Sequence, residues 1–468
     1  MMKTKGSIAK RKTIWIFTGA GLLLVLLGVF LWIWLSRASG IQTIALDPDY
    51  QELFTEEQIK AHKMHLPEYD TDTTIGYLNQ DGTKSLYVYA VPIQYKNESA
   101  GWVQIDTRLA TLEDADLLAQ GFAYTVAAND IVPLFPQELS QESGIRLSTD
   151  IVYTFGVDTD RPIRGRVRAL DNFIGQEKNM MVYDDAFGSG TSARFYPSSL
   201  GVNAEISIDE APSDGKLTMW LQMPYGTELV ETNGGYLTIN TLEKEAETLA
   251  LIQKPLLKGA DGRIDYSGTV AFTRLSSDYY LLEFTFDQET LTKGSTIFLS
   301  FEMRREKQPD NALYSNFPDL EYAYLRNYTV IGNSSDYGIG QLLIRYMFTS
   351  MFHLQADDIL SASYSTYSLT QNSDQLELRT VLEDWCSLTG NWNDHYQIGD
   401  RTSLLEVIQP ELCFDITEEV KMWCGDPDGQ LEHNGVLLKS AQEREGLYNV
   451  LLSNDNTLYR NHTEIHLR

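Results

Sequence analysis

Short stretches in which alternate residues are apolar recur along most of this chain, and they constrain its fold more than any other feature. They include Ser85–Ile93, Lys216–Met223, Tyr279–Phe286 and Thr296–Met303. Turn signals separate them, among them Asp81-Gly82, Asn233-Gly234-Gly235 and Asp261-Gly262. Alternation with a period of two is typical of half-buried strands, and many short strands separated by turns are typical of sandwiches or barrels. The sequence therefore predicts a mainly β fold.

The N-terminus has the pattern of a membrane anchor. Basic residues at positions 3, 5, 10, 11 and 12 precede Ile14–Leu35, a run of 22 residues without a charge. As a helix this run spans about 33 Å, enough to cross a bilayer, and it is longer than the apolar core of a typical signal peptide. Basic flanks stay in the cytoplasm. We predict a single-pass protein of the cell membrane with its bulk outside; a cleaved signal is the alternative.

The net charge excludes one class of partner. The chain carries 37 basic and 65 acidic residues, a formal charge of -28. Nucleic acid binding needs a basic face, so no nucleic acid partner is predicted. The expected partners are the lipid bilayer, through Ile14–Leu35, and polysaccharide or other surface proteins.

The chain divides into six predicted segments. Arg304–Phe317 is charged, contains Pro309 and has no periodicity, which is typical of a linker. Thr55 and Gln58 form a possible capping box for a short helix through Lys63. The segments are a cytoplasmic tail at 1–12, a transmembrane helix at 13–35, a stalk at 36–69, a β-rich domain at 70–303 (one unit or two), a linker at 304–318 and a second β domain at 319–468.

Two tryptophan-containing segments near the C-terminus echo each other. Thr380–Cys386 and Asp415–Cys424 each run from a polar cap through an aliphatic residue and an acid to tryptophan. Asp415 and Glu418 have the spacing of an N-cap and its third helical residue. Ile416, Val420 and Trp423 then share one helix face. We predict two short helices whose tryptophans, Trp385 and Trp423, are buried.

The C-terminal third resembles the DNRLRE domain of bacterial wall-associated and YD-repeat surface proteins. The matching stretches, in order, are Val330–Gly332, Leu343–Phe348, Asp357–Ala362, Asn391–Asn393, Phe414–Thr417, Asn434–Lys439 and Glu464–Leu467. Upstream, Tyr89–Tyr95, Gly101–Asp106 and Tyr196–Ile206 resemble the region that precedes such modules. The chain departs from that pattern in Asn203-Ala204, where a lysine is usual, and it lacks the aspartate-proline, the YD repeats and the toxin.

The resemblance implies a jelly-roll sandwich at the C-terminus, in a class grouped with carbohydrate-binding modules. It also makes Trp385, Trp423, Asp415 and Asn434 fold-signature residues. We therefore predict a non-enzymatic surface protein that binds cell-wall or host carbohydrate. The alternative is a structural or protein-interaction ectodomain without glycan binding.

The predicted ligand-binding cluster is a loop around one tryptophan. Sugar binding uses an aromatic face together with a few oriented polar groups. Trp392 lies among polar residues that could supply them: Asn391, Asn393 and His395. The alternative is that Trp392 packs in the core.

No metal or cofactor is predicted, with one open alternative. His62 and His65 lack nearby further ligands and are interpreted as surface histidines. Gly425-Asp426-Pro427-Asp428-Gly429 is either a plain turn or half of a structural Ca²⁺ loop. The three cysteines are too few for a disulfide framework. Cys386 and Cys424 either form a bridge or are buried thiols, and Cys413 has no predicted role.

Overall fold

The computed structural model describes residues 53–468, except 55, 98–100, 149–150, 172–175, 213, 233, 244–245, 262–263, 304–309, 320–327, 346–353, 371–374, 386–389, 409, 426–433 and 453–460. All of these belong to one compact unit, Ile44–Arg468. The described chain is mainly β, as predicted. The predicted tail, transmembrane helix and most of the stalk lie outside the described residues. Within the described part, no helix is long and apolar enough to span a bilayer.

The first pair of sheets, here called the first sandwich, contains most strands of the middle of the chain. One sheet has the order β22 (Thr269–Arg274), β23 (Tyr279–Thr285), β16 (Lys216–Gln222), β11 (Val152–Val157), β10 (Ile145–Ser148), β8 (Val132–Pro136), β7 (Phe122–Ala128) and β6 (Asp106–Thr111). The other has the order β17 (Thr227–Glu231), β18 (Leu237–Thr241), β19 (Thr248–Ile252), β24 (Thr296–Met303), β15 (Gly201–Ile208), β14 (Thr191–Pro197), β13 (Gln176–Asp184), β12 (Ile163–Asp171) and β9 (Glu138–Leu139), with β20 (Leu256–Lys258) and β21 (Ile264–Asp265) beside β24.

The core of the first sandwich follows directly from the alternation in the sequence. On β23, Tyr280, Leu282 and Phe284 are buried, whereas the residues between them are partly exposed. Phe155 of β11 stacks on Phe301 of β24 with ring centroids 3.8 Å apart. Aromatic and aliphatic side chains that leave water supply most of the free energy that holds such sheets together.

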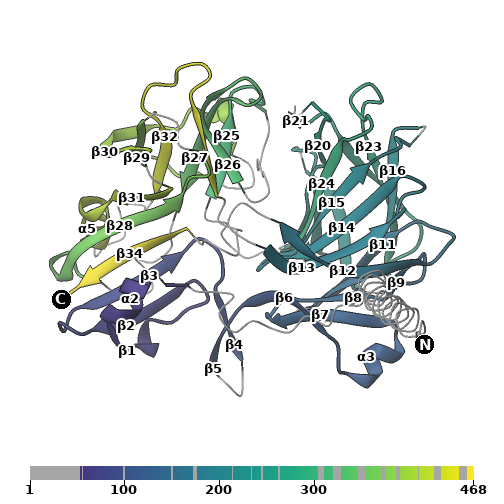
Figure 1. The fold of residues 1–468 in the computed structure, drawn as a ribbon, viewed down its shortest axis with the longest axis horizontal. Coiled ribbons are helices and arrows are strands. Elements are labelled where there is room, and N and C mark those ends of the chain that lie inside the picture. The colour runs from purple at the N-terminus through teal and green to yellow at the C-terminus, as the bar shows by residue number, and fades with distance from the viewer. Residues whose placement is uncertain are drawn as a thin grey trace, which may run out of the picture. The chain divides into compact units, whose positions relative to one another are not determined.

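The second pair of sheets, the second sandwich, contains both ends of the described chain. One sheet has the order β1 (His62–His65), β2 (Thr74–Asn79), β3 (Lys84–Tyr89), β34 (His462–Leu467), β28 (Ile359–Tyr367) and β31 (Glu411–Asp415) (Figure 1). The other has the order β30 (Ile398–Glu406), β29 (Gln375–Val381), β32 (Val436–Ser440), β27 (Gly338–Ile344), β26 (Tyr328–Ser334) and β33 (Tyr448–Leu452), with β25 (Asp310–Tyr314) paired to β27.

The second sandwich therefore begins far earlier in the sequence than predicted. Strand β34 pairs with β3 on one side and with β28 on the other. The hairpin β2–β3 was assigned to the β-rich domain at 70–303, and β1 to the stalk at 36–69. Both assignments are wrong for these strands, because β3 pairs with one edge of β34 and β2 and β1 extend the same sheet. Leu86, Val88 and Ile465 share one buried cluster.

The predicted linker also contributes a strand. Strand β25 lies within 304–318 and pairs with β27 along its whole length. Its residues Ala312, Leu313 and Tyr314 are buried. Burial of these apolar side chains stabilises a strand here, although the surrounding sequence has the composition of a linker.

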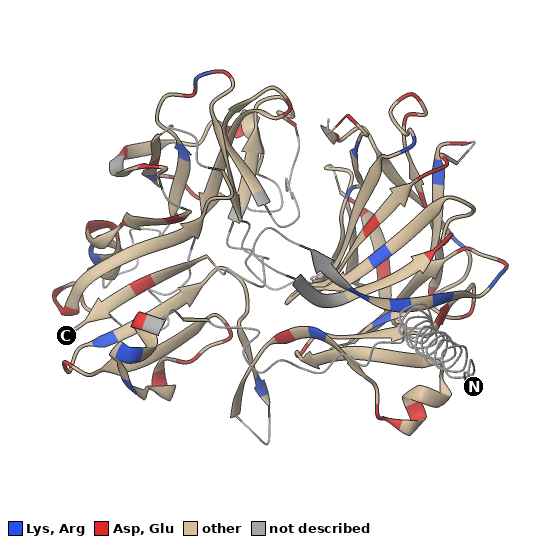
Figure 2. Cartoon of the chain, in the orientation of Figure 1, with Lys and Arg blue, Asp and Glu red and all other residues tan. Residues whose placement is uncertain are grey.

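The remaining described elements are short. They are the hairpin β4 (Gln94–Asn97) and β5 (Gly101–Gln104), the helices α2 (Glu56–Ala61), α3 (Ala115–Ala119) and α5 (Thr417–Cys424), and the 3-10 turns η1 (Pro67–Tyr69), η2 (Ala356–Asp358) and η3 (Trp392–Asp394). Helix α2 confirms a short helix in the predicted stalk, although it ends at Ala61 rather than at Lys63, and β1 begins at His62. Acidic residues are spread over turns and strands of both sandwiches, in keeping with the net charge of -28 (Figure 2).

The two tryptophan segments differ in structure. The second contains helix α5, as predicted, with Ile416, Val420 and Trp423 buried, but the N-cap is Ile416 rather than the predicted Asp415. The first is not a helix in its described part: β29 ends at Val381, and irregular chain follows to Trp385. Its Thr380 is paired to Val436 in the sheet, so the predicted cap is unavailable to a helix.

Candidate functional site

The last strand, β34, presents ionisable side chains on the outward face of the six-stranded sheet. Thr463, Ile465 and Leu467 point inward and are buried. Glu464 and His466 therefore lie on the opposite face. On the neighbouring strand β3, Ser85 stands opposite His466 and Tyr87 stands opposite Glu464. Cross-strand neighbours on one face approach closely, so this register brings two polar pairs together.

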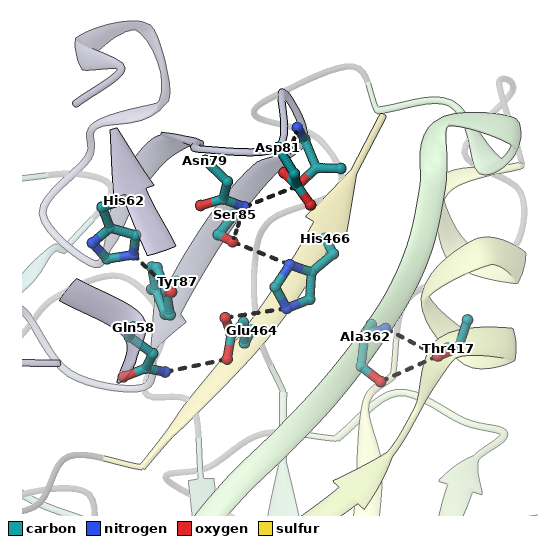
Figure 3. Close-up of polar contacts among 11 residues, drawn as sticks. Gln58, His62, Asn79, Asp81, Ser85, Tyr87, Ala362, Thr417, Glu464 and His466 are labelled. Carbon is teal, nitrogen blue, oxygen red and sulfur yellow. Dashed lines mark hydrogen bonds and ion pairs between the residues drawn. The ribbon is translucent and has the colours of Figure 1, made fainter. Parts of the chain in front are cut away.

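A continuous chain of hydrogen bonds joins these groups (Figure 3). Asn79 Nδ2 donates to Ser85 Oγ at 2.9 Å, and Ser85 Oγ is 3.1 Å from His466 Nδ1. His466 Nε2 lies 3.2 Å from Glu464 Oε1. Gln58 Nε2 of helix α2 donates to Glu464 Oε2, also at 3.2 Å. We call Gln58, His62, Ser85, Tyr87, Glu464 and His466 the seam, because they join the N-terminal segment to the C-terminal strand.

Aromatic rings cover the N-terminal side of the seam. The imidazole of His62 stacks on Tyr77 with centroids 3.9 Å apart and planes 3° apart. Its Nε2 is 2.9 Å from the Tyr87 hydroxyl. Phe54 packs edge-on against His62, Tyr77 and Tyr87. The Tyr89 hydroxyl donates to the carbonyl of Leu53 at 3.1 Å. The N-terminal segment is thus held by both ring packing and hydrogen bonds.

Contacts within the seam raise the pKa of some of its side chains and lower the pKa of others. Burial lowers the pKa of His62, and the nearby Glu464 charge opposes this. The hydrogen bond to Glu464 raises the pKa of His466. Burial disfavours the charge of Glu464, but hydrogen bonds from His466, Tyr87 and Gln58 together lower its pKa. Burial and the Glu464 charge raise the pKa of Tyr87. At neutral pH, Glu464 is therefore the fixed negative charge around which the seam is built.

Ser85, His466 and Glu464 are hydrogen-bonded in the order of the serine, histidine and acid of a hydrolase triad. However, the serine hydroxyl that would act as nucleophile is shielded. Ser85 is 1% exposed and lies in the middle of the sheet, between β2 and β34. Its oxygen already accepts a hydrogen bond from Asn79. A substrate carbonyl must approach a nucleophile within van der Waals distance, which this position prevents. The arrangement fits a buried polar network that fixes strand register better than a catalytic centre.

The predicted ligand cluster forms a well-ordered turn at η3. Asn391 caps it: its Oδ1 accepts from the Asn393 amide at 3.0 Å, and its own amide donates to Asp394 Oδ2 at 2.9 Å. Asn393 Nδ2 donates to Asp319 Oδ1 at 2.6 Å. Trp392 is partly exposed and packs one side against the buried residues around Trp385. His395 is exposed with a left-handed φ of 50°.

The four fold-signature residues lie in two places. Trp385 is buried and donates from Nε1 to the carbonyl of Asn434 at 2.8 Å. Asp415 Oδ1 accepts from the amide of Thr417 at 3.0 Å at the start of α5, whose Trp423 is buried. Thr417 in turn holds the helix to β28, since the Ala362 amide donates to its Oγ1 at 2.9 Å (Figure 3).

The remaining predicted sites have mixed outcomes. His65 Nε2 is 2.9 Å from Asp70 and His62 contacts Tyr87, and no group of three or more metal-binding side chains occurs among the described residues. The acidic loop after Gly425 lies outside the described residues, as does Cys386. Cys413 and Cys424 are free thiols, so no bridge involves Cys424. Burial raises the pKa of Cys424 to about 11.

The sequence interpretation missed the seam altogether. A signal was present: Glu464 and His466 alternate with buried residues in a strand-like segment, the pattern of a strand with a polar outer face. Their partners Gln58 and Ser85 are almost a chain length away, so the sequence could not show what they contact.

Comparisons with known proteins add little. No family model matches the chain, and no curated protein matches it. Among solved structures, one match is the N-terminal domain of the Streptococcus gordonii adhesin Sgo0707. It has 5% sequence identity and a TM-score of 0.17, over 91% of this chain and 93% of that one. At this TM-score the two structures cannot be said to share a fold.

Proposed function

We propose that this protein is a membrane-anchored surface protein that binds cell-wall or host carbohydrate without catalysis. In this proposal Ile14–Leu35 is the anchor, the N-terminus is cytoplasmic, and the second sandwich is a jelly-roll module related to the DNRLRE domain. The supporting observation is the turn at Trp392, where a partly exposed indole is held in place beside polar side chains.

The turn has the physical properties that sugar recognition requires. Trp392 offers an apolar face, and the exposed Asn393 and His395 lie beside it in sequence. Hydrogen bonds within the turn and to Asp319 hold its conformation before any ligand arrives. A preorganised site loses less conformational entropy on binding, which matters for weak ligands such as glycans.

Glycan-array binding tests the proposal with the full chain in phosphatidylcholine nanodiscs. We expect Trp392→Ala to lose binding, since stacking of a sugar ring on the indole would be a large share of a small interface. Trp102→Ala is the matched control, because Trp102 is a partly exposed tryptophan on the separate hairpin β4–β5. Unchanged far-UV circular dichroism would show that both variants fold. Absence of binding to every wall or host polysaccharide would contradict the proposal.

A structural or protein-interaction ectodomain is the second candidate, and the seam favours it. The polar groups of Glu464 and His466 are engaged within the chain, in holding the N-terminal segment to the last strand. Crosslinking in intact membranes tests this candidate: it predicts reproducible neighbouring membrane proteins and no glycan affinity. Recovery of this chain alone would weaken it.

A further inference from the structure

The outward face of β12 carries a row of arginines in an otherwise acidic protein. Arg164, Arg166 and Arg168 alternate with Gly165 and Val167, which are buried. Val167 belongs to the core of the first sandwich, and a side chain at Gly165 would collide with Tyr183 of β13. The three arginines therefore share the outer face, with successive Cα atoms about 6.6–6.8 Å apart along the strand.

Few acidic groups neutralise this row. Arg166 pairs with Asp184 of β13. Arg164 lies opposite the exposed Glu138 of β9 without an ion pair. Within the described residues, neither Arg164 nor Arg168 pairs with a carboxylate. Two of the three guanidinium groups therefore make no ion pair with a described side chain.

A fourth arginine extends the basic surface across the sheet. Val182 of β13 pairs with Arg166 on one side and with Arg194 of β14 on the other. Arg194 Nη1 is 3.8 Å from Glu205 Oε2. Burial raises the pKa of Glu205 to about 7, so this carboxyl is only partly charged at neutral pH and screens Arg194 incompletely.

We propose that the arginine row of β12 binds a linear polyol-phosphate polymer, in which phosphodiesters join sugar-alcohol units such as glycerol. Guanidinium groups bind phosphate through two parallel hydrogen bonds, and exposed arginines keep this geometry available. A straight strand presents its arginines at a regular repeat, which fits a polymer with regularly spaced phosphates. A membrane surface would instead favour a broad basic face. This site is separate from the turn at Trp392 and does not depend on carbohydrate binding there.

The overall acidity of the chain limits the affinity that we expect for a polyanion. The net charge of -28 repels a polyanion at long range. At physiological salt the Debye length is about 8 Å, so distant charges are screened while guanidinium–phosphate contacts persist. We therefore expect moderate affinity for short polymer segments.

Titration of a synthetic poly(glycerol phosphate) against the full chain in phosphatidylcholine nanodiscs tests the proposal. The variant R164Q/R166Q/R168Q should bind at least about tenfold more weakly, because each exposed charge contact contributes a few-fold in affinity. The matched control K96Q/R274Q/K293Q removes the same charge from exposed positions on other elements and should stay within about twofold. Equal thermal midpoints of the two variants would show that folding is unaffected.

The salt dependence gives an independent readout. With three arginine contacts, the logarithm of the binding constant should fall with the logarithm of salt concentration with a slope of about -2. The row variant should have a slope near zero. Equal weakening in both variants would show a general charge effect and overturn the proposal. So would failure of the wild type to bind the polymer, or binding confined to vesicles of phosphatidylglycerol, which would assign the row to a membrane surface.

Discussion

Gln58 donates a hydrogen bond to Glu464 at 3.2 Å, although 406 positions separate them in the sequence. The contact joins the helix nearest the predicted membrane anchor to the final strand. Because Glu464 also takes hydrogen bonds from His466 and Tyr87, one carboxylate connects three elements. The stability of the second sandwich should therefore depend on this group.

Replacing Glu464 with glutamine should destabilise the protein. The amide has one acceptor oxygen, so it cannot serve the three donors that face the carboxylate, and a buried donor is left without a partner. We expect a loss of about 1–3 kcal/mol in the free energy of unfolding, measured by urea denaturation at pH 7. Glu283→Gln is the control, since Glu283 pairs with Lys216 at the surface and should cost less than about 1 kcal/mol. Equal losses of unfolding free energy in the two variants would show that Glu464 contributes no more than a surface ion pair.

Stability should pass through a maximum near neutral pH. The folded pKa of His62 is lowered, so the unfolded state binds more protons and stability falls as pH drops below about 6.5. The folded pKa of His466 is raised, so its contribution is complete below about 6.5 and is lost as pH rises through the folded pKa. Thermal midpoints from pH 5 to 8 measure this. His62→Gln should flatten the acid side and His466→Gln the alkaline side; the reverse pattern would refute these assignments.

Trp385→Phe should lower stability although the ring remains aromatic. The substitution removes the Nε1 donor to the carbonyl of Asn434, which is buried. We expect a cost of about 1–3 kcal/mol in chemical denaturation. Trp102→Phe, on the hairpin β4–β5, should change stability by less than about 0.5 kcal/mol. A similar value for both would mean that water replaces the indole donor.

Residues 310–468, which include β25, should not fold alone, because they lack β1, β2 and β3. Without β3, strand β34 becomes an exposed edge, and the buried cluster loses Leu86 and Val88. We expect an insoluble fragment.

A permutant provides the complementary measurement. His62 pairs with Asn79, and Leu467 pairs with Lys84, so both lie at the same end of the sheet. Residues 56–97 fused after Arg468 through a flexible linker should restore a soluble protein with a cooperative thermal transition. A soluble, cooperative fragment without this addition would disprove the requirement.

The sequence allowed prediction of those features that depend on local pattern. The alternation at Tyr279–Phe286 became β23, and the spacing of Ile416, Val420 and Trp423 became a buried helix face. The helix at Trp385 failed because Thr380 is taken by the sheet. The division of the chain failed at β1–β3 because strand pairing between distant segments leaves no local pattern. Binding by the Asn391–His395 turn stays a prediction.

The central position of β34 also has a consequence for how the protein is made. The hairpin β2–β3 is synthesised well before its partner β34, because every strand of the first sandwich lies between them in the sequence. At typical rates of synthesis the wait is roughly tens of seconds. During this time every strand of the first sandwich becomes available to fold, while Leu86 and Val88 have no final neighbour. Nascent chains therefore carry an unpaired, aggregation-prone hairpin until β34 has been synthesised, so β2–β3 should be the segment of the second sandwich that most needs chaperone protection during synthesis.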